Sequence, residues 1–316
     1  MIDVEVLEAN IRTMAAVLPG ARLRPHVKAH KCTSLARVQR DLGGHVGFTC
    51  ATIREVEGMA AAGLGDDLLL ANEVLDASRL GVLDARVTLA VDSPETIDSA
   101  VRGGVREVLI DVDVGLPRCG CAVAEAGRLA DLARSNGLSV RGVMGYEGQA
   151  TAVPDRVARA EVVEKAMGLL LAAYADVGGD VISAGATVTY DLNTWATEIQ
   201  AGSYVLMDSY FGAMEPTFRQ ALHLHLDVIS VSPRGWAVLN GGLKALGMDH
   251  GPPTLADDAG EVLIVSDEHI TFRPSGSVAV GDRVRVIPAH VDPTVAYHDH
   301  MTLTTGDRWP IDLRGW

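Results

Sequence analysis

The feature that most constrains the fold is a regular alternation of two patterns along the first two thirds of the chain. From about residue 21 to residue 208, short runs rich in β-branched and other apolar residues alternate with stretches whose apolar residues recur at helical spacing. Glycines such as Gly63, Gly137 and Gly178 separate many of them. Strands that alternate with helices pair in parallel, because each helix returns the chain to the same end of the sheet. The sequence therefore predicts an α/β fold, a (β/α)8 barrel.

The pattern changes after about residue 212. We expect barrel strands at 23–29, 47–51, 67–72, 87–92, 107–112, 139–146, 180–183 and 204–208. Helical patterns lie between them, for example at 34–42, 54–62, 124–136 and 155–176. Later short strands are expected at 222–232, 235–240, 261–266, 269–273, 283–287 and 301–304, separated by Gly, Pro and Asp turns. The predicted domains are a barrel over residues 1–212 and a smaller, mainly antiparallel β domain over residues 213–316.

Charge and composition exclude several classes of partner. A net charge of −14 argues against nucleic acid and anionic membranes, because phosphate binding needs a basic surface. The start of the chain has no basic-then-apolar signal and no apolar run is long enough to span a bilayer, so the expected location is the cytoplasm. The four cysteines include no CxxC pair, and we expect reduced thiols.

A basic segment at residues 24–31, Arg-Pro-His-Val-Lys-Ala-His-Lys, is the sharpest chemical signal. On a strand, alternate residues face one side, so Arg24, His26, Lys28 and His30 are expected to face the barrel interior. A lysine among cationic neighbours is more easily deprotonated, which makes its amine a nucleophile, and the same face would attract an anionic cofactor. The alternative interpretations are a salt-bridged polar plug and an exposed turn mistaken for a strand.

This segment resembles the lysine motif of the D-threonine aldolase and D-serine dehydratase family. These are pyridoxal-phosphate (PLP) enzymes of fold type III with an alanine-racemase-like barrel. Further matches occur in the same order at 47–52, 71–73, 111–120, 183–187, 266–269 and around His290. The resemblance implies that Lys28 holds PLP, that the substrate is an amino acid, and that the protein is a homodimer.

The expected cofactor contacts follow from two Gly-containing segments and from the resemblance. Backbone N–H groups and hydroxyls at 183–187 and 201–204 would suit a phosphate, although such segments are also ordinary turns. Arg118 resembles a family residue near the PLP ring; the alternative is an Arg–Asp pair at the barrel rim. The residues expected to contact PLP are His26, Lys28, Arg118, Tyr146, Gly185, Thr187, Gly202, Ser203 and Tyr204. Glu147 stands where D-threonine aldolases commonly have His, and it is a candidate general base.

His290 and Asp292 form a candidate metal pair. At spacing i, i+2 they would share one face of a strand, and two protein ligands leave coordination positions open for a substrate. The alternative is a simple hydrogen-bonded pair. The resemblance places this His-x-Asp at the family's metal position, where dehydratases have His-x-Cys and favour zinc. A carboxylate favours manganese or magnesium and the aldolase branch. His298 and His300 are expected at the surface and not as ligands.

The combined pattern predicts a PLP- and metal-dependent lyase that cleaves a D-3-hydroxy amino acid, such as D-threonine, to glycine and an aldehyde. The alternative is a dehydratase that uses the same site and releases ammonia and a 2-oxo acid. A racemase would leave the metal pair unexplained, and a non-catalytic PLP carrier would not need residues 213–316. An unrelated sugar-phosphate barrel would leave the basic face at 24–30 unexplained.

Overall fold

The computed structural model describes the whole chain, Met1–Trp316, as two compact units. The barrel unit comprises Met14–Lys28, Leu35–Gly202 and Leu313–Trp316. The β unit comprises Met1–Thr13, Ala29–Ser34 and Ser203–Asp312. The division therefore differs from the single boundary expected at residue 212, because two short early segments pack with the later part of the chain.

Seven parallel strands form the sheet of the barrel unit, in the same order as in the sequence. They are β1 (Phe48–Cys50), β2 (Leu68–Leu70), β3 (Val87–Val91), β4 (Glu107–Asp111), β5 (Ser139–Met144), β6 (Val181–Ala184) and β7 (Glu198–Ile199). Both edges of this sheet bridge to residues 23–26: Leu23 pairs with Ile199, and His26 pairs with Thr49. This segment therefore acts as the eighth strand, and the predicted (β/α)8 barrel with a second β domain is confirmed.

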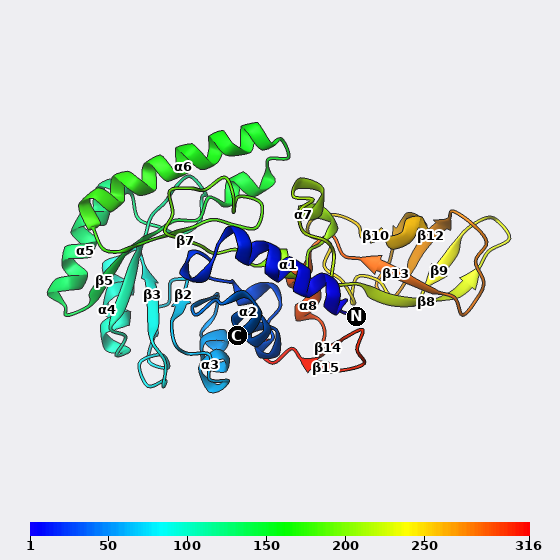
Figure 1. Ribbon diagram of the computed structural model, residues 1–316, viewed down its shortest axis with the longest axis horizontal. Coiled ribbons are helices and arrows are strands. Elements are labelled where there is room, and N and C mark those ends of the chain that lie inside the picture. Colours follow the sequence, from blue (N-terminus) through cyan, green and yellow to red (C-terminus); the bar gives the residue numbers. More distant parts are fainter. The chain divides into compact units, whose positions relative to one another are not determined.

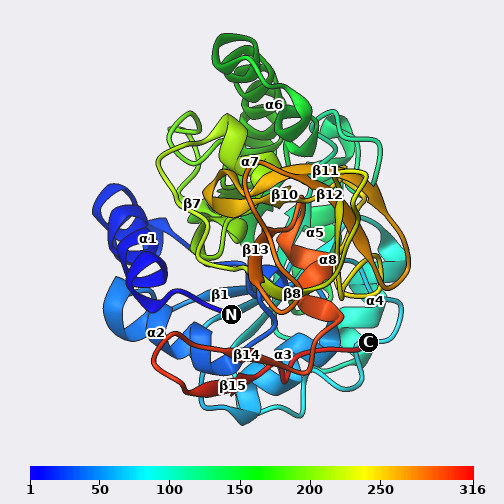
Figure 2. The same cartoon turned by 90° about the vertical axis from the view of Figure 1, so that its right-hand side faces the viewer.

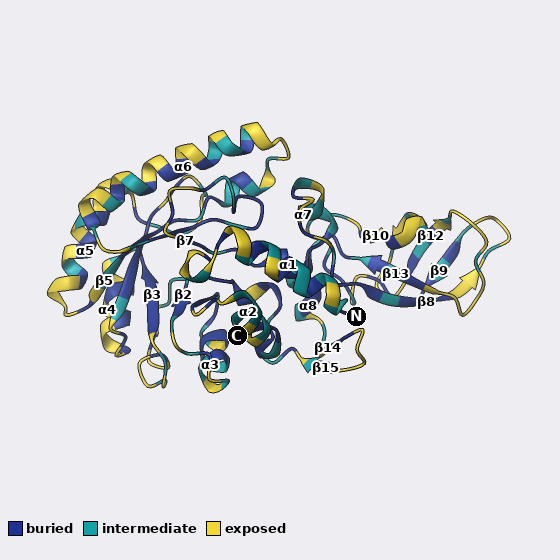
Figure 3. Cartoon of the chain, viewed as in Figure 1, coloured by how far each residue is buried: buried dark blue, intermediate teal, exposed yellow.

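Helices cover the outside of the parallel strands (Figure 1). They are α2 (Thr33–Gly43), α3 (Ile53–Ala61), α4 (Pro94–Arg102), α5 (Ala126–Ser135) and α6 (Arg156–Val177). Single 3-10 turns are η1 (Gly20–Arg22), η2 (Val27–Ala29), η3 (Val123–Glu125) and η4 (Gly148–Ala152). The strands are buried, whereas α6 has buried residues on one side and exposed residues on the other (Figure 3). None of the helices is both long and apolar enough to cross a bilayer.

Two predicted barrel strands are wrong in part. The segment expected at 23–29 is extended only to His26, because Val27–Ala29 forms a 3-10 turn. The strand expected at 204–208 is replaced by β7 at Glu198–Ile199, and Ser203–Val205 forms the 3-10 turn η5. Residues 204–207 are fully buried, and an apolar run alone does not distinguish a buried strand from a buried turn.

A charged layer fills one end of the barrel interior. Arg24 is 4% exposed; it donates to Glu198 through Nε (2.9 Å) and to Asp67 through Nη2 (2.8 Å). Arg141 reaches the same Asp67 (2.7 Å) and Thr88 Oγ1 (2.7 Å). These residues come from strands around the wall, so their contacts cross the barrel. The polar plug considered as an alternative for the basic segment is therefore correct for Arg24.

An apolar layer lies two residues further along the strands. Leu69, Ala90, Leu109 and Met144 form one buried cluster. Three of them follow Asp67, Thr88 and Glu107 by two positions, as expected for side chains on one face of a strand. In β5 a bulge changes this parity, because the register shifts where Leu109 pairs with Gly142. Gly142 has φ +149°, and a Cβ there would lie 1.9 Å from the carbonyl oxygen of Val181, so a glycine is required.

The β unit is built on an antiparallel sheet with strand order β10-β13-β8-β9-β12-β11. Its strands are β8 (Leu224–Val231), β9 (Ala237–Leu239), β10 (Thr254–Leu255), β11 (Gly260–Val265), β12 (Ile270–Pro274) and β13 (Arg283–Ile287). The outer strands β10 and β11 also contact one another, so the sheet curls into a nearly closed barrel. A separate hairpin joins β14 (His300–Thr302) and β15 (Arg308–Pro310) (Figure 2). The remaining helices are α1 (Val4–Val17), α7 (Ser209–Met214) and α8 (Val291–Ala296).

The charged layer predicts a defined pH dependence of stability. Burial alone would raise the pKa of Asp67, but hydrogen bonds from Arg141 and Arg24 lower it to about 2, below its ordinary value of 3.8. A carboxylate whose pKa is depressed in the folded state stabilises the fold above its unfolded pKa and loses that contribution as the pH falls. We expect Asp67→Asn to lower the free energy of unfolding by about 3 kcal/mol at pH 7, because it breaks a buried ion pair.

Urea unfolding followed by circular dichroism measures this difference. The difference in free energy of unfolding between wild type and Asp67→Asn should become smaller as the pH falls from about 4 to about 2. Asp131→Asn, at an exposed Arg134 pair, is the matched control and should change stability by less than about 0.5 kcal/mol. An Asp67→Asn difference that stays constant from pH 7 to pH 2 would contradict the assigned role.

Candidate functional site

The carboxyl ends of the parallel strands gather most of the predicted cofactor residues. Residues at these ends face one mouth of a barrel, which is where such folds place their reactive groups. His26 and Lys28 follow the first strand segment, Arg118 follows β4, Tyr146 follows β5, Gly185 and Thr187 follow β6, and Gly202 follows β7. The barrel therefore brings to one mouth residues that are far apart in the sequence.

The lysine segment differs from its predicted geometry. Because Val27–Ala29 is a 3-10 turn, strand alternation ends at His26, and neither Lys28 nor His30 shares the interior face of Arg24. The backbone N–H of His26 donates to the carbonyl of Ala201 (3.0 Å), which fixes the end of the strand beside the segment that leads into Gly202. The turn then carries Lys28 out of the barrel wall at the mouth.

Arg118 and Tyr146 meet at this mouth. The guanidinium carbon of Arg118 lies 5.1 Å from the centroid of the Tyr146 ring, a cation–π arrangement. Tyr146 lies two residues after Met144, the last residue of β5 and a member of the apolar layer. The structure thus joins two side chains that were predicted independently, and Arg118 stacks on the ring rather than forming the alternative Arg–Asp pair.

Acidic residues at the ends of β2 and β4 keep the nearby thiols protonated. Burial and the negative charge of Glu73 raise the pKa of Asp111 well above its ordinary range. A hydrogen bond to Glu73, together with burial, raises the pKa of the Cys119 thiol to about 12, and burial raises that of Cys121 to about 12. All four cysteines are free, as predicted, and these two are poor nucleophiles at neutral pH.

Glu147 is enclosed and holds the loop that follows β6. Its side chain is 0% exposed and accepts hydrogen bonds from the Gly185 N–H (3.0 Å), Thr189 Oγ1 (3.0 Å) and Asn193 Nδ2 (3.1 Å). Thr189 Oγ1 also accepts from the N–H of Ala186 (2.9 Å). The N–H groups of residues 185 and 186 therefore donate to acceptors within the protein. Gly185 would serve a cofactor by its small size and not as a hydrogen-bond donor. These contacts fit a positioning role; the base role of Glu147 stays a prediction.

The other predicted phosphate contacts divide between the units. Thr187 is buried in the loop after β6, and Gly202 is the last residue of this part of the barrel unit. Ser203 and Tyr204 belong to the β unit, in η5. Tyr204 is fully buried, with its ring edge-on to Phe218 at 5.6 Å between centroids. Small residues, hydroxyls and one lysine form a donor set that suits a phosphorylated aldehyde cofactor.

The metal pair lies at the start of a short helix and not on a strand. His290 is the N-cap of α8, and Asp292 lies in its first turn. His290 Nε2 is nevertheless 3.9 Å from Asp292 Oδ1, so both can face one ion. An imidazole nitrogen and a carboxylate oxygen suit a divalent cation. The expected placement of the pair on one face of a strand is therefore wrong, and its role as a metal pair stays a prediction.

Sequence reasoning missed Asp249 and His250. Asp249 Oδ2 lies 2.6 Å from His290 Nδ1, and the ring of His250 stacks on that of His290 at 4.0 Å between centroids. Asp249, His250 and His290 form the one group of three potential ligands in the chain. The dipeptide Asp249-His250 carries two potential ligands, but it is too far from His290 in the sequence for the pattern to indicate that they are neighbours.

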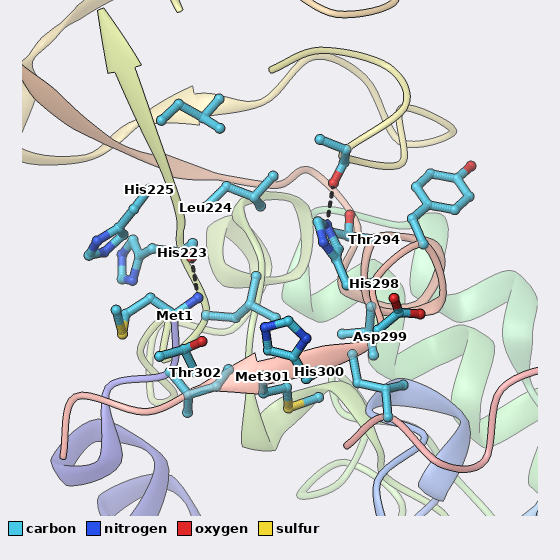
Figure 4. A pocket seen from close by; sticks show the side chains of 17 residues that line it. Met1, His223, Leu224, His225, Thr294, His298, Asp299, His300, Met301 and Thr302 are labelled. Atoms are coloured by element: carbon cyan, nitrogen blue, oxygen red, sulfur yellow. Dashed lines mark hydrogen bonds between the residues drawn. The ribbon is translucent and has the colours of Figure 1, made fainter. Parts of the chain in front are cut away.

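His298 and His300 do not join this group. They line a separate cavity of about 410 Å³ within the β unit, together with His223, His225 and Met1 (Figure 4). His298 Nε2 lies 2.8 Å from the carbonyl oxygen of Ala245, and His300 contacts Arg308. The expectation that they are not metal ligands stays a prediction.

Comparisons with known proteins cover the whole chain. Residues 2–209 match the family model described as alanine racemase, N-terminal domain, and residues 221–304 match the putative serine dehydratase domain. The chain is 31% identical to a D-threonine aldolase from Arthrobacter sp. (100% of this chain, 92% of that protein). It is 29% identical to a 3-hydroxy-D-aspartate aldolase from Paracoccus denitrificans (100% and 91%). The crystal structure of D-threonine aldolase from Filomicrobium marinum matches with a TM-score of 0.93 at 29% identity (100% and 95%).

The contacts of Glu147 predict a phosphate-specific effect. The Glu147 carboxylate accepts three hydrogen bonds, and in Glu147→Gln one of its oxygens becomes an NH2 group. This NH2 group must face at least one of the groups that donate to Glu147, so the loop after β6 should shift. We expect PLP affinity to fall by about tenfold, the equivalent of one lost hydrogen bond to a charged group. Affinity for pyridoxal, which has no phosphate, should be unchanged, and quenching of protein fluorescence measures both. Equal affinities for PLP in the two proteins, with turnover lost, would instead support Glu147 as the base.

Proposed function

The chain belongs to the family that contains the D-threonine aldolases and the D-serine dehydratases, and we propose that it is a PLP- and metal-dependent aldolase. Its substrate is a D-3-hydroxy amino acid, which it cleaves to glycine and an aldehyde. The observation that carries this proposal is the carboxylate of Asp292, 3.9 Å from His290 Nε2, in a chain that aligns over its full length with aldolases. A hard oxygen donor at this position favours manganese or magnesium over zinc.

The residues at the barrel mouth would hold the cofactor. Lys28 would bind it covalently, and Arg118 and Tyr146, which contact one another, would lie near its ring. Thr187 and Gly202 of the barrel unit would contact its phosphate, and Glu147 orders the loop that contains Thr187. The same role for Ser203 and Tyr204, which belong to the β unit, stays a prediction. PLP, when bound, supplies an electron sink for the electron pair left on Cα when the Cα–Cβ bond breaks.

His290 and Asp292 would hold the divalent ion. Such an ion lowers the pKa of a bound hydroxyl, so it prepares the 3-hydroxyl of the substrate for loss of its proton. Transfer of that proton to a base would let the Cα–Cβ bond break, so that the aldehyde leaves, the electron pair passes into the cofactor, and protonation of Cα gives glycine. The same pair would assist departure of hydroxide in a dehydratase, so identification of the products decides between the two reactions.

Product identification with D-threonine tests the proposal. We expect glycine and acetaldehyde from the PLP-loaded protein with manganese, no products after chelation, and recovery when manganese is restored. Chromatography of the amino acids and an alcohol dehydrogenase assay for acetaldehyde measure both products. Lys28→Ala is the inactive control, and L-threonine tests the configuration at Cα. Ammonia and 2-oxobutyrate in place of glycine and acetaldehyde would contradict the aldolase and establish the dehydratase.

A further inference from the structure

We propose that Asp249 is a positioning residue for the metal site: it holds the His290 ring so that Nε2 faces the ion. The inference rests on the proposed function, since it concerns the ion that His290 and Asp292 would bind. It extends the predicted metal site by the carboxylate of Asp249, which was not identified from the sequence and which lies outside the His-x-Asp pair.

The two nitrogens of His290 face different carboxylates. Nδ1 lies 2.6 Å from Asp249 Oδ2, and Nε2 lies 3.9 Å from Asp292 Oδ1. A short contact between a ring nitrogen and a carboxylate places the proton on that nitrogen, which leaves the other with a lone pair for a metal. Asp249 therefore selects the tautomer that can bind an ion beside Asp292. An ion at Nε2 lies on the opposite edge of the ring from Asp249, which is why we assign Asp249 to positioning rather than to ligation.

The His290 ring is also fixed through its faces. The His250 ring lies parallel to it, 4.0 Å away and tilted by 8°, and Phe211 meets it edge-on at 6.0 Å. Asp208 links the helices that carry these residues, because it accepts from the N–H of Phe211 in α7 (2.8 Å) and from that of Val291 in α8 (3.0 Å). The ring therefore has little freedom to turn while Asp249 holds its edge.

The loop that carries Asp249 is anchored to α8. Gly247 forms a β-bridge with His290, and its N–H donates to Thr294 Oγ1 (3.0 Å). Thr294 Oγ1 in turn donates to the carbonyl of His290 (2.6 Å). A Cβ on Gly247 would lie 2.4 Å from Pro293, so only glycine allows this close approach. Asp249 itself is about half exposed, at 53%, yet its backbone is held against the residue that it orients.

Manganese binding by the full-length protein tests the inference without turnover. The free ion is measured by electron paramagnetic resonance with wild type, Asp249→Ala and Asp249→Asn. Loss of an outer carboxylate weakens metal binding by about 10- to 100-fold, and we expect this for Asp249→Ala. Asp249→Asn should have a smaller effect, because its amide oxygen still accepts from Nδ1–H. Asp267→Asn, an exposed carboxylate in the same unit, is the matched control and should bind as wild type does.

Histidine nitrogen NMR of the metal-free protein supplies a second measurement. The His290 signals should show the proton on Nδ1 in wild type and Asp249→Asn, and both tautomers in Asp249→Ala. Equal melting temperatures without metal would confirm that the variants fold. Unchanged manganese affinity in Asp249→Ala, with affinity lost in His290→Ala, would overturn this inference and leave the proposed function intact. No manganese binding by wild type would overturn both.

Discussion

The ion-pair layer around Arg24 is the interaction on which the barrel and its site depend. A buried guanidinium is costly unless it is paired, and Glu198 and Asp67 supply its partners from opposite sides of Leu23–His26. The same segment closes the sheet by bridging β7 and β1. The Arg24 pairs hold this segment in the wall, and a 3-10 turn follows directly after His26. That turn is where Lys28 lies, at the carboxyl ends of the strands.

Carboxylates do much of the positioning in both units. Glu147 is buried and orders the loop after β6 through three hydrogen bonds, and Asp249 holds the edge of His290. Neither residue needs to exchange a proton in these roles. The proposed reactive residues Lys28 and His290 lie at a turn and at a helix end, which have fewer backbone constraints than strands. Carboxylates held in fixed positions restrict the conformations of such segments and side chains where regular secondary structure does not.

The layers of the barrel follow from the sequence, but the local exceptions do not. The alternation of strands and helices predicted the fold, and seven of the parallel segments were found where expected or close to it. Strand alternation failed at Lys28, which lies in the 3-10 turn Val27–Ala29, and at His290, which caps the start of a helix. In both cases the segment also contacts residues distant in sequence, which strand alternation does not show: the Arg24 pairs at the first, and the bridge to Gly247 at the second. Asp249 and Asn193 were missed for the same reason, since their partners are distant in sequence.

Synthesis in the reverse direction tests the central claim most directly, because only an aldolase can form a bond between Cα and Cβ. The PLP-loaded protein with manganese would be incubated with glycine and acetaldehyde, and the amino acids separated by chiral chromatography. The account predicts D-configured threonine or allo-threonine, absent when manganese is removed or Lys28 is replaced by alanine. No new amino acid, from protein that converts D-threonine to 2-oxobutyrate and ammonia, would contradict it.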